Sequence, residues 1–308
     1  MPGSHITGWG ATLPDKRVTN ADLATWLDTS DAWIRDRTGI SERRVGAGTT
    51  ELAVQAGRQA LDRAGVALDQ IDLVVVATLS PDQATPATAS IVQEALGLRC
   101  GAFDLNAACS GFVYGLVMAA GLLGTGMRHV LVIGAESMSR LVDWDDRTTA
   151  ILFGDGAGAV VLSSSGTDDA ILGWDLGSDG SAAGILRADI GGCVTMDGGA
   201  VFRRAVRAMV DSSERAMRGA GVDADDLALV VPHQANRRII EASTHRLGIP
   251  MERVVMVLER TGNTSAASIP IALTDGVDAG RLDRGDLVLM TGFGAGMTWA
   301  SVVLRWEP

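Results

Sequence analysis

The sequence predicts an α/β protein in which helices cover buried strands. First, short apolar runs typical of buried strands, such as residues 73–77 and 129–134, follow helical stretches. Second, the 308 residues are 47% hydrophobic and 20% charged, which suits a large core in one or two domains. Third, the second half of the chain repeats the pattern of the first half.

The repeat is clearest around two glycines. Residues 64–77 and 220–233 each contain a helix end, a glycine cap, an acidic turn and a buried strand. Gly65 and Gly221 are 221 − 65 = 156 positions apart. The pattern therefore covers a whole helix-to-strand connection rather than a few residues.

Two further matches follow in the same order. Residues 129–134 resemble residues 286–291 at an offset of 286 − 129 = 157, and residues 96–98 resemble residues 247–249 more loosely. Three matches in one order predict two α/β halves, joined near residues 163–166. The expected boundaries of the two halves are 1–164 and 165–308.

One cysteine lies where a predicted strand gives way to a predicted helix. Residues 101–105 are expected to form a buried strand, and residues 112–123, apolar nearly all round, a helix buried on every side. Cys109 would therefore lie near unpaired N–H groups and the positive end of the helix dipole, which stabilise a thiolate. A free cysteine is also a common small buried residue, so this segment alone leaves both interpretations open.

The repeat brings two more polar residues into consideration. A strand is expected before Gly262 as it is before Cys109, so Cys109 and Asn263 would occupy equivalent strand-to-helix junctions. His233 ends a predicted strand of the second half. If the halves pack about a pseudo-twofold axis, the three side chains form a competent nucleophilic set of thiolate, base or donor, and amide donor. Taken singly, His233 fits a core residue and Asn263 a left-handed turn.

Composition argues against several classes of protein. The formal net charge of −11 makes general nucleic-acid binding unfavourable. Three cysteines and four scattered histidines provide neither a disulfide framework nor metal-ligand spacing. The first residues lack the features of a signal peptide, and no apolar run reaches the roughly 18 residues of a membrane span. We therefore expect a reduced, cytoplasmic, soluble protein without a metal site.

Six motifs along essentially the whole chain resemble those of the β-ketoacyl–acyl carrier protein synthase III family, within the thiolase-like superfamily. They are residues 33–44, 106–112 (NAACSGF), 153–159 (FGDGAGA), 233–236 (HQAN), 262–268 (GNTSAAS) and 292–299 (GFGAGMTW). The resemblance implies a thiolase-like fold, with two pseudo-repeated βαβαβαββ halves in a five-layer α-β-α-β-α arrangement. It also implies a homodimer.

The resemblance implies roles for the three polar residues. Cys109 would take an acyl group from an acyl-CoA as a thioester. His233 and Asn263 would donate hydrogen bonds to the thioester carbonyl of a malonyl group on acyl carrier protein. Those donors would stabilise the enolate as carbon dioxide leaves, and the carbanion would then attack the acyl-cysteine. Neither step needs a cofactor beyond the two substrates.

Other positions are assigned by the same resemblance. Backbone amides of Cys109 and of the turn at Ala295 and Gly296 would hold the oxyanion, although these glycine-rich residues could serve only close strand packing. Phe293 would disfavour the malonyl carboxylate. Thr85 stands where the family places a residue that reaches into the partner's acyl pocket. A residue this small suggests room for a primer longer than acetyl, including a branched one.

Four residues resemble family positions along the CoA path. Trp33 and Arg147 would sandwich the adenine, and Arg37 and Asn236 would line the nucleotide and pantetheine path. Trp33 and Arg37 are one helical turn apart, so both can face one groove. A packed aromatic side chain is the alternative for Trp33.

A cluster of arginines is the local exception to the acidic composition. An acidic carrier protein would be attracted to such a patch near the expected tunnel mouth, and a solvated helix face is the alternative. The residues are Arg203, Arg204, Arg237, Arg238 and Arg246.

Alternative functions remain open at this point. Relatives with this fold start polyketides, or move acyl groups to hydroxyls or amines without condensation, and some are non-catalytic partner subunits. A thiolase proper does not fit, because residues 292–296 hold no second cysteine. Residues 162–196 look shorter than in many relatives, so CoA contacts there cannot be carried over. The primer, the extender and the pathway are not readable from the sequence.

Overall fold

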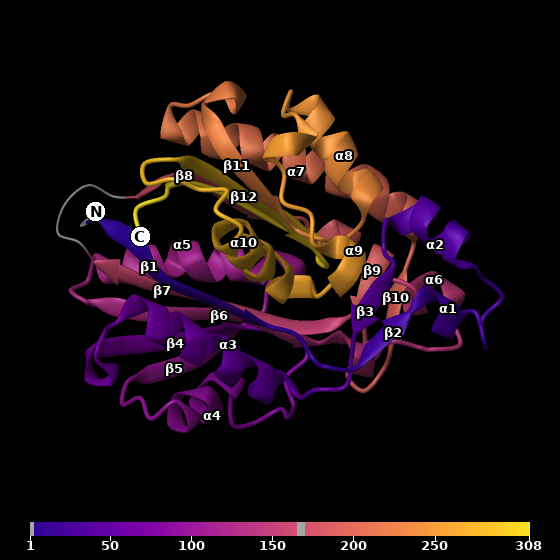
Figure 1. Cartoon of the computed structure of the whole chain (residues 1–308), viewed down its shortest axis with the longest axis horizontal. Helices are drawn as coiled ribbons and strands as arrows, with labels where there is room; N and C mark the ends of the chain where they lie inside the picture. The colour runs from indigo at the N-terminus through magenta and orange to yellow at the C-terminus, as the bar shows by residue number, and fades with distance from the viewer. Residues whose placement is uncertain (1–2, 165–169) are drawn as a thin grey trace.

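In the computed structural model, which describes residues 3–164 and 170–308, two β-sheets are stacked between three layers of helices (Figure 1). This five-layer order confirms the predicted thiolase-like arrangement. From one outer layer through the centre to the other, the helices are α3 (Thr49–Ala64) and α4 (Thr88–Ala95); α5 (Gly111–Leu123) and α10 (Ser268–Asp278); α7 (Gly198–Ala220) and α8 (Arg237–Arg246).

The first sheet has the order β1-β7-β6-β4-β5 and comes entirely from the first half of the chain. β4 pairs in parallel with β5 and β6, whereas β7 is antiparallel to both β1 and β6. Its strands are β1 (Ser4–Thr12), β4 (Ile71–Ala77), β5 (Gly101–Leu105), β6 (His129–Ser137) and β7 (Asp155–Ser164).

The second sheet has the order β11-β12-β13-β8 and comes from the second half. β11 and β12 are parallel, and β13 is antiparallel to β12 and β8. Its strands are β8 (Ile171–Ser178), β11 (Leu227–Pro232), β12 (Leu287–Gly294) and β13 (Thr298–Arg305).

The strand expected before Gly262 does not form. Val254 makes only an isolated parallel bridge to Val230, and the chain continues into the short helix α9 (Leu258–Thr261). Asn263 then pairs through its backbone with the first half, donating to the carbonyl of Leu152 and accepting from the N–H of Gly154. The prediction is wrong because this segment leaves the second sheet to contact the other half.

Short elements gather at one end of the stack (Figure 1), where they cover the end at which the central helices begin. They include the antiparallel pairs β2–β3 and β9–β10. Their bounds are β2 (Arg17–Thr19), α1 (Asn20–Leu23), α2 (Asp31–Thr38), β3 (Glu42–Arg44), α6 (Arg147–Ala150), β9 (Leu186–Ala188) and β10 (Val194–Met196).

The central helices explain the long apolar run in the sequence. Phe112, Val113 and Leu116 of α5 are fully buried because a sheet covers the helix on each side. Two expectations for this region are wrong in detail. Met118 is 41% exposed, so α5 is not buried on every side. β5 is the edge strand of its sheet and is only partly buried.

The strand registers show that the two halves correspond residue by residue. Ile71 of β4 pairs with His129 of β6, as Leu227 of β11 pairs with Leu287 of β12. The offsets are therefore 227 − 71 = 156 and 287 − 129 = 158. The second value is one larger than the sequence match predicts.

The expected boundary between residues 164 and 165 lies at the edge of the segment 165–169, which is outside the described residues. The described strands on either side of it, β7 and β8, belong to different sheets. Within the described residues, no helix combines the length and the apolar composition that crossing a membrane requires.

Candidate active site

A cavity of about 920 Å³ is lined by residues from both halves. Cys109, which follows β5, His233, which follows β11, and Asn263, which precedes α10, all line it. The structure thus brings together three side chains that are far apart in the sequence. All three are at least nine-tenths buried.

The turn Ala108–Ser110, called the nucleophile turn after the role predicted for Cys109, has an unusual backbone conformation. Ala108 has a φ of +47°, and its N–H donates to the side-chain oxygen of Asn106 at 3.1 Å. Cys109 lies in the 3-10 turn Ala108–Ser110, which leads directly into α5. The asparagine thus stabilises a conformation that few non-glycine residues adopt.

The same turn occurs in the other half. The N–H of Ser265, whose φ is +48°, donates to the side-chain oxygen of Asn263 at 2.9 Å. Asn263 therefore corresponds to Asn106, since 263 − 106 = 157, and Cys109 corresponds to Ala266. Cys109 and Asn263 therefore lie at equivalent junctions, as predicted, but three positions apart within them.

His233 is held as a neutral donor. Its Nδ1 lies 2.6 Å from the hydroxyl of Ser268, and that hydroxyl accepts the N–H of Gln234 at 3.3 Å. The serine can then donate its proton to Nδ1, and in that tautomer the imidazole proton lies on Nε2. Burial lowers the pKa of His233 to about 3, so the ring is uncharged at neutral pH. Nε2 is buried and has no partner among the described residues.

The environment of the Cys109 sulfur favours the protonated thiol. Burial raises the pKa of Cys109 to about 12; the neighbouring Ser265 side chain lowers it, and the Glu136 carboxylate raises it further. This differs from the expectation of a thiolate at the helix terminus. Desolvation of the charged form outweighs the favourable dipole at this fully buried position.

The turn between β12 and β13 forms another wall. Ala295 and Gly296 line the cavity, and the Thr298 hydroxyl bonds to the carbonyl oxygens of Ala107 at 2.9 Å and of Ala295 at 3.2 Å. The turn is thereby tied to the nucleophile turn. Phe293 packs edge-on against His233, with ring centroids 5.4 Å apart.

Gly294 lies against the backbone of the nucleophile. A Cβ at this position would be 2.6 Å from the backbone nitrogen of Cys109 and 3.0 Å from the Thr298 hydroxyl. Only glycine leaves space beside the Cys109 N–H. This space is where an oxyanion facing that N–H would be accommodated.

The predicted CoA residues gather at one part of the cavity. The guanidinium groups of Arg37 and Arg147 lie 4.8 and 4.9 Å from the ring of Trp33. All three residues line the cavity. Asn236 lines it as well, caps α8 by accepting the N–H of Arg238, and donates to the carbonyl of Arg37 at 2.9 Å.

The predicted arginine patch is only partly assembled around this cavity. Arg203 and Arg204 line a second cavity of about 430 Å³, and Arg204 pairs with Asp179 at 2.9 Å. Arg237 and Arg238 begin α8 beside Asn236, at the end nearest the main cavity. Arg246 ends the same helix, roughly 14 Å away.

Thr85 lies in the exposed segment 81–86 and is not among the residues that line the cavity of its own chain. Its expected role concerns a partner's pocket and stays a prediction. Among the described residues, no three histidine, cysteine or acidic side chains are grouped so that they could hold a metal ion.

Sequence reasoning missed two residues that orient this site. Ser268 lies inside a recognised motif, so its closeness to His233 could have been suspected. Glu136 ends the apolar run of β6, and a lone acidic residue there is itself a signal. Its interactions, however, are with side chains far away in the sequence.

Comparison with known proteins assigns the chain to one family. Residues 103–180 match the family described as 3-oxoacyl-[acyl-carrier-protein (ACP)] synthase III, and residues 217–306 match its C-terminal part. The chain is 49% identical to β-ketoacyl-[acyl-carrier-protein] synthase III of Roseiflexus sp. (strain RS-1), over 98% of each chain.

Solved structures give the same result. The synthase III of Aquifex aeolicus VF5 superposes with a TM-score of 0.97 at 46% identity, covering 99% of this chain and 100% of that one. The priming β-ketosynthase of the R1128 polyketide biosynthetic pathway gives 0.94 at 40% identity, covering 99% and 96%.

Proposed function

The chain belongs to the 3-oxoacyl-[acyl-carrier-protein] synthase III family, and we propose that it condenses an acyl-CoA primer with malonyl–acyl carrier protein. One observation carries the proposal. A cysteine, a neutral histidine whose buried Nε2 has no partner among the described residues, and an asparagine amide line one cavity beside a glycine that leaves space next to the cysteine N–H. This is the donor set that acyl transfer followed by decarboxylation requires.

In the first step, the Cys109 sulfur attacks the carbonyl carbon of the acyl-CoA. The bond between that carbon and the CoA sulfur breaks, and the cysteine proton leaves with CoA as its thiol. The negative oxygen of the tetrahedral intermediate lies in the space beside Gly294, where the Cys109 N–H donates to it. Because the resting thiol has a raised pKa, substrate binding must supply part of the cost of deprotonation.

In the second step, the malonyl thioester carbonyl lies between His233 and Asn263. Nε2–H of His233 and the amide N–H₂ of Asn263 donate to its oxygen. The carbon–carboxylate bond breaks, carbon dioxide leaves, and the electron pair forms an enolate. The enolate carbon then attacks the acyl-cysteine, and the Cys109 sulfur leaves and takes up one proton. Phe293 keeps an apolar surface beside the departing carboxylate. The reaction balances without a metal or cofactor.

Removing one enolate donor should separate the two steps. In His233→Ala and Asn263→Ala, condensation is expected to fall about 100-fold or more, because one donor to the developing charge is lost. Acylation of Cys109 by acyl-CoA should stay within about threefold, since neither donor faces that oxyanion. Intact-protein mass spectrometry measures acylation, and product formation from malonyl–carrier protein measures condensation. Equal losses in both steps would contradict the proposed roles.

The same experiment tests the alternative functions. An acyl-enzyme that does not react with malonyl–carrier protein but transfers its acyl group to an alcohol or an amine would indicate a non-condensing acyltransferase. A chain that no acyl-CoA modifies would indicate a non-catalytic subunit.

We also propose that the carrier protein docks over the first turns of α7 and α8. Phe202 lines the main cavity, and Arg203 and Arg204 follow it on α7, while Arg237 and Arg238 begin α8. These cations would attract an acidic partner to the cavity entrance despite the net charge of −11.

Charge reversal tests this surface. In Arg203→Glu/Arg204→Glu, the KM for malonyl–carrier protein is expected to rise about 10-fold at low salt, with less difference in high salt. The kcat and the acylation by CoA should not change. Arg284→Glu is the control, because this exposed arginine precedes the opposite end of β12. An equal effect of both changes would exclude the proposed surface.

The homodimer and the cytoplasmic location remain part of the proposal, supported by the family and by three free cysteines. A primer longer than acetyl also remains part of it. A strict preference for acetyl-CoA in competition assays would contradict the role assigned to Thr85.

A further inference from the structure

Glu136 is a fully buried carboxylate near the end of β6, and none of the assigned roles uses it. Its two oxygens accept hydrogen bonds from two segments that are far apart in the sequence. One is the loop after β4, at Thr78, Leu79 and Ser80, and the other is the turn before α10, at Ser265 and Ala266. No ion pair to Glu136 occurs among the described residues.

Every group that faces this carboxylate can donate. The N–H groups of Leu79 at 3.2 Å, Ser80 at 3.1 Å and Ala266 at 3.4 Å can only donate. The Ser265 hydroxyl donates at 2.9 Å, and the hydroxyls of Thr78 and Ser80 complete the set. Burial raises the pKa of Glu136 above its ordinary value, and these hydrogen bonds, which favour the charged form, offset only part of that rise. The donor set matches an ionised carboxylate and does not match an amide.

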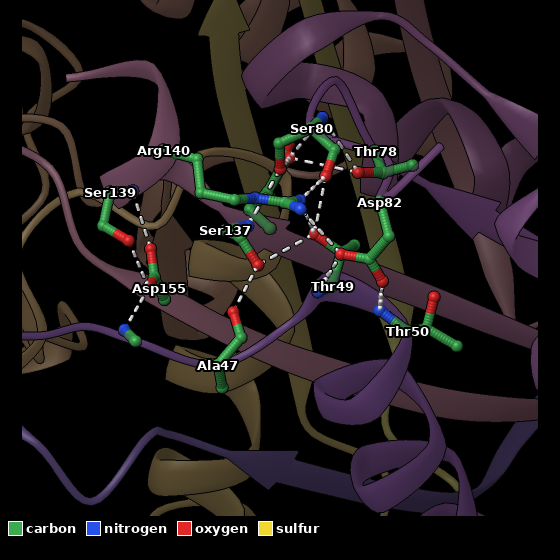
Figure 2. Close-up of polar contacts among 12 residues, drawn as sticks. Ala47, Thr49, Thr50, Thr78, Ser80, Asp82, Ser137, Ser139, Arg140 and Asp155 are labelled. Carbon is green, nitrogen blue, oxygen red and sulfur yellow. Dashed lines mark hydrogen bonds and ion pairs between the residues drawn. The ribbon is translucent and has the colours of Figure 1, made fainter. Parts of the chain in front are cut away.

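The loop after β4, which donates to Glu136 through Ser80, is held in place by further contacts of Ser80 and Asp82 (Figure 2). The carbonyl of Ser80 accepts hydrogen bonds from Arg140 and from the Thr49 hydroxyl, both at 2.6 Å. Arg140 also pairs with Asp82 at 2.8 Å, and the Asp82 carboxylate caps the first N–H groups of α3. Glu136 therefore links the turn before α10 to a part of the first half that is fixed independently.

The pseudo-symmetry shows what the carboxylate replaces. Glu136 corresponds to Gly294 at the offset of 294 − 136 = 158 that the strand registers give, and Ala266 corresponds to Cys109. In the catalytic half, Gly294 leaves the N–H of Cys109 accessible. In the other half, the Glu136 carboxylate accepts the equivalent N–H of Ala266. A permanent anion of the protein thus fills the place that is left open for the substrate oxyanion.

We propose that Glu136 is a positioning residue for the condensation step. It fixes Ser265 and Ala266 in place, so that the Ser265 N–H continues to donate to the side-chain oxygen of Asn263. With its oxygen bound in this way, the Asn263 side chain directs its amide N–H₂ at the cavity. Glu136 touches neither substrate and acts through Asn263. The inference rests on the proposed condensing function.

The test compares half-reactions in Glu136→Gln. A glutamine at position 136 would place its N–H₂ group against N–H and O–H donors of Ser80, Ser265 or Ala266, so the turn before α10 must shift. Condensation should fall about 10- to 100-fold in kcat, as expected for a donor displaced by a fraction of an ångström to 1 Å. The KM for malonyl–carrier protein and the rate of Cys109 acylation should stay within about threefold. Equal loss in both half-reactions would overturn the proposal.

A second readout does not depend on the reaction. The charged groups that titrate beside Cys109 are Glu136 and His233, and His233 is neutral above its low pKa. The Glu136 charge raises the thiol pKa, so its removal lowers that pKa. Alkylation of Cys109 by iodoacetamide should therefore be about threefold faster or more at a fixed pH between 7 and 9 in Glu136→Gln. An unchanged pH profile would contradict an ionised Glu136.

Asp155→Asn is the matched control. Asp155 is also a fully buried carboxylate that begins a neighbouring strand, but it binds Ser139 and the N–H of Gly46 instead (Figure 2). It should change neither the ratio of the half-reactions nor the alkylation profile. If it reproduces the effects of Glu136→Gln, those effects reflect lost stability and the proposal fails.

Ser265→Ala covers the case in which Glu136→Gln does not fold. Alanine tolerates the left-handed backbone here, because Ala108 has nearly the same φ in the other half. Loss of the hydroxyl should lower condensation about 10-fold. Acylation should fall by less than condensation, because the Ser265 side chain also lowers the pKa of the Cys109 thiol. A wild-type chain that is acylated but forms no product with malonyl–carrier protein would refute the proposed function itself. In that case the alkylation rates would still show whether Glu136 is ionised beside Cys109.

Discussion

Cys109→Ala is expected to abolish acylation and to lower turnover by at least about 1,000-fold, because Cys109 is the only cysteine that lines the cavity among the described residues. The cavity should survive, since alanine fits where a buried thiol did and leaves the backbone of the nucleophile turn in place. Intact-protein mass spectrometry after exposure to a panel of acyl-CoAs would show the wild type gaining one acyl group and the variant gaining none.

The other two cysteines serve as controls for this result. Cys193 is exposed and Cys100 is partly buried, and neither lines the cavity. Cys100→Ala and Cys193→Ala should both gain one acyl group, as the wild type does. Acylation that persists in Cys109→Ala and disappears in one of these controls would assign the nucleophile elsewhere.

Gly294→Ala is expected to impair both half-reactions, by about 100- to 1,000-fold. The added Cβ would lie 2.6 Å from the backbone nitrogen of Cys109 and 3.0 Å from the Cβ of Ala108. Backbone cannot yield as the end of a side chain does, so the methyl group occupies the space beside the Cys109 N–H. In the proposed mechanism, that N–H donates to the oxyanion during acylation and again when the enolate attacks, so both steps should slow.

Single-turnover acylation and condensation assays measure this effect. Gly121→Ala is the control, because a Cβ there, on the central helix α5, would meet nothing within 4 Å. It should leave both rates unchanged. If Gly294→Ala retained normal acylation, the Cys109 N–H would not be the oxyanion donor in that step.

Much of the fold could be predicted because its signals are local. A strand such as residues 71–77 is recognised from its own apolar run, and Gly65 from its place at the end of a helix, where it adopts a φ of +62°. The repeat of these signals predicts two similar halves. The strand before Gly262 was predicted wrongly because Asn263 pairs with Leu152 and Gly154 of the other half, and no local pattern reveals such a partner.

The chemistry of the site divides in the same way. The sequence by itself determined which residues could react, since the nucleophilic and hydrogen-bonding groups of a cysteine, a histidine and an asparagine are properties of those side chains. Only the tertiary structure decided the protonation states of the cysteine and the histidine. Burial raises the pKa of the Cys109 thiol and lowers that of His233, and burial depends on what packs around a group rather than on its neighbours in sequence.

Glu136 shows the same division most clearly. The sequence determined that an acidic residue ends an apolar strand. The packing of the two halves decided that this carboxylate meets Ser265 and Ala266 on one side and Ser80 on the other. Hydrogen bonds act only over about 3 Å, so the pairing exists only after distant segments have been brought together by the burial of their apolar faces.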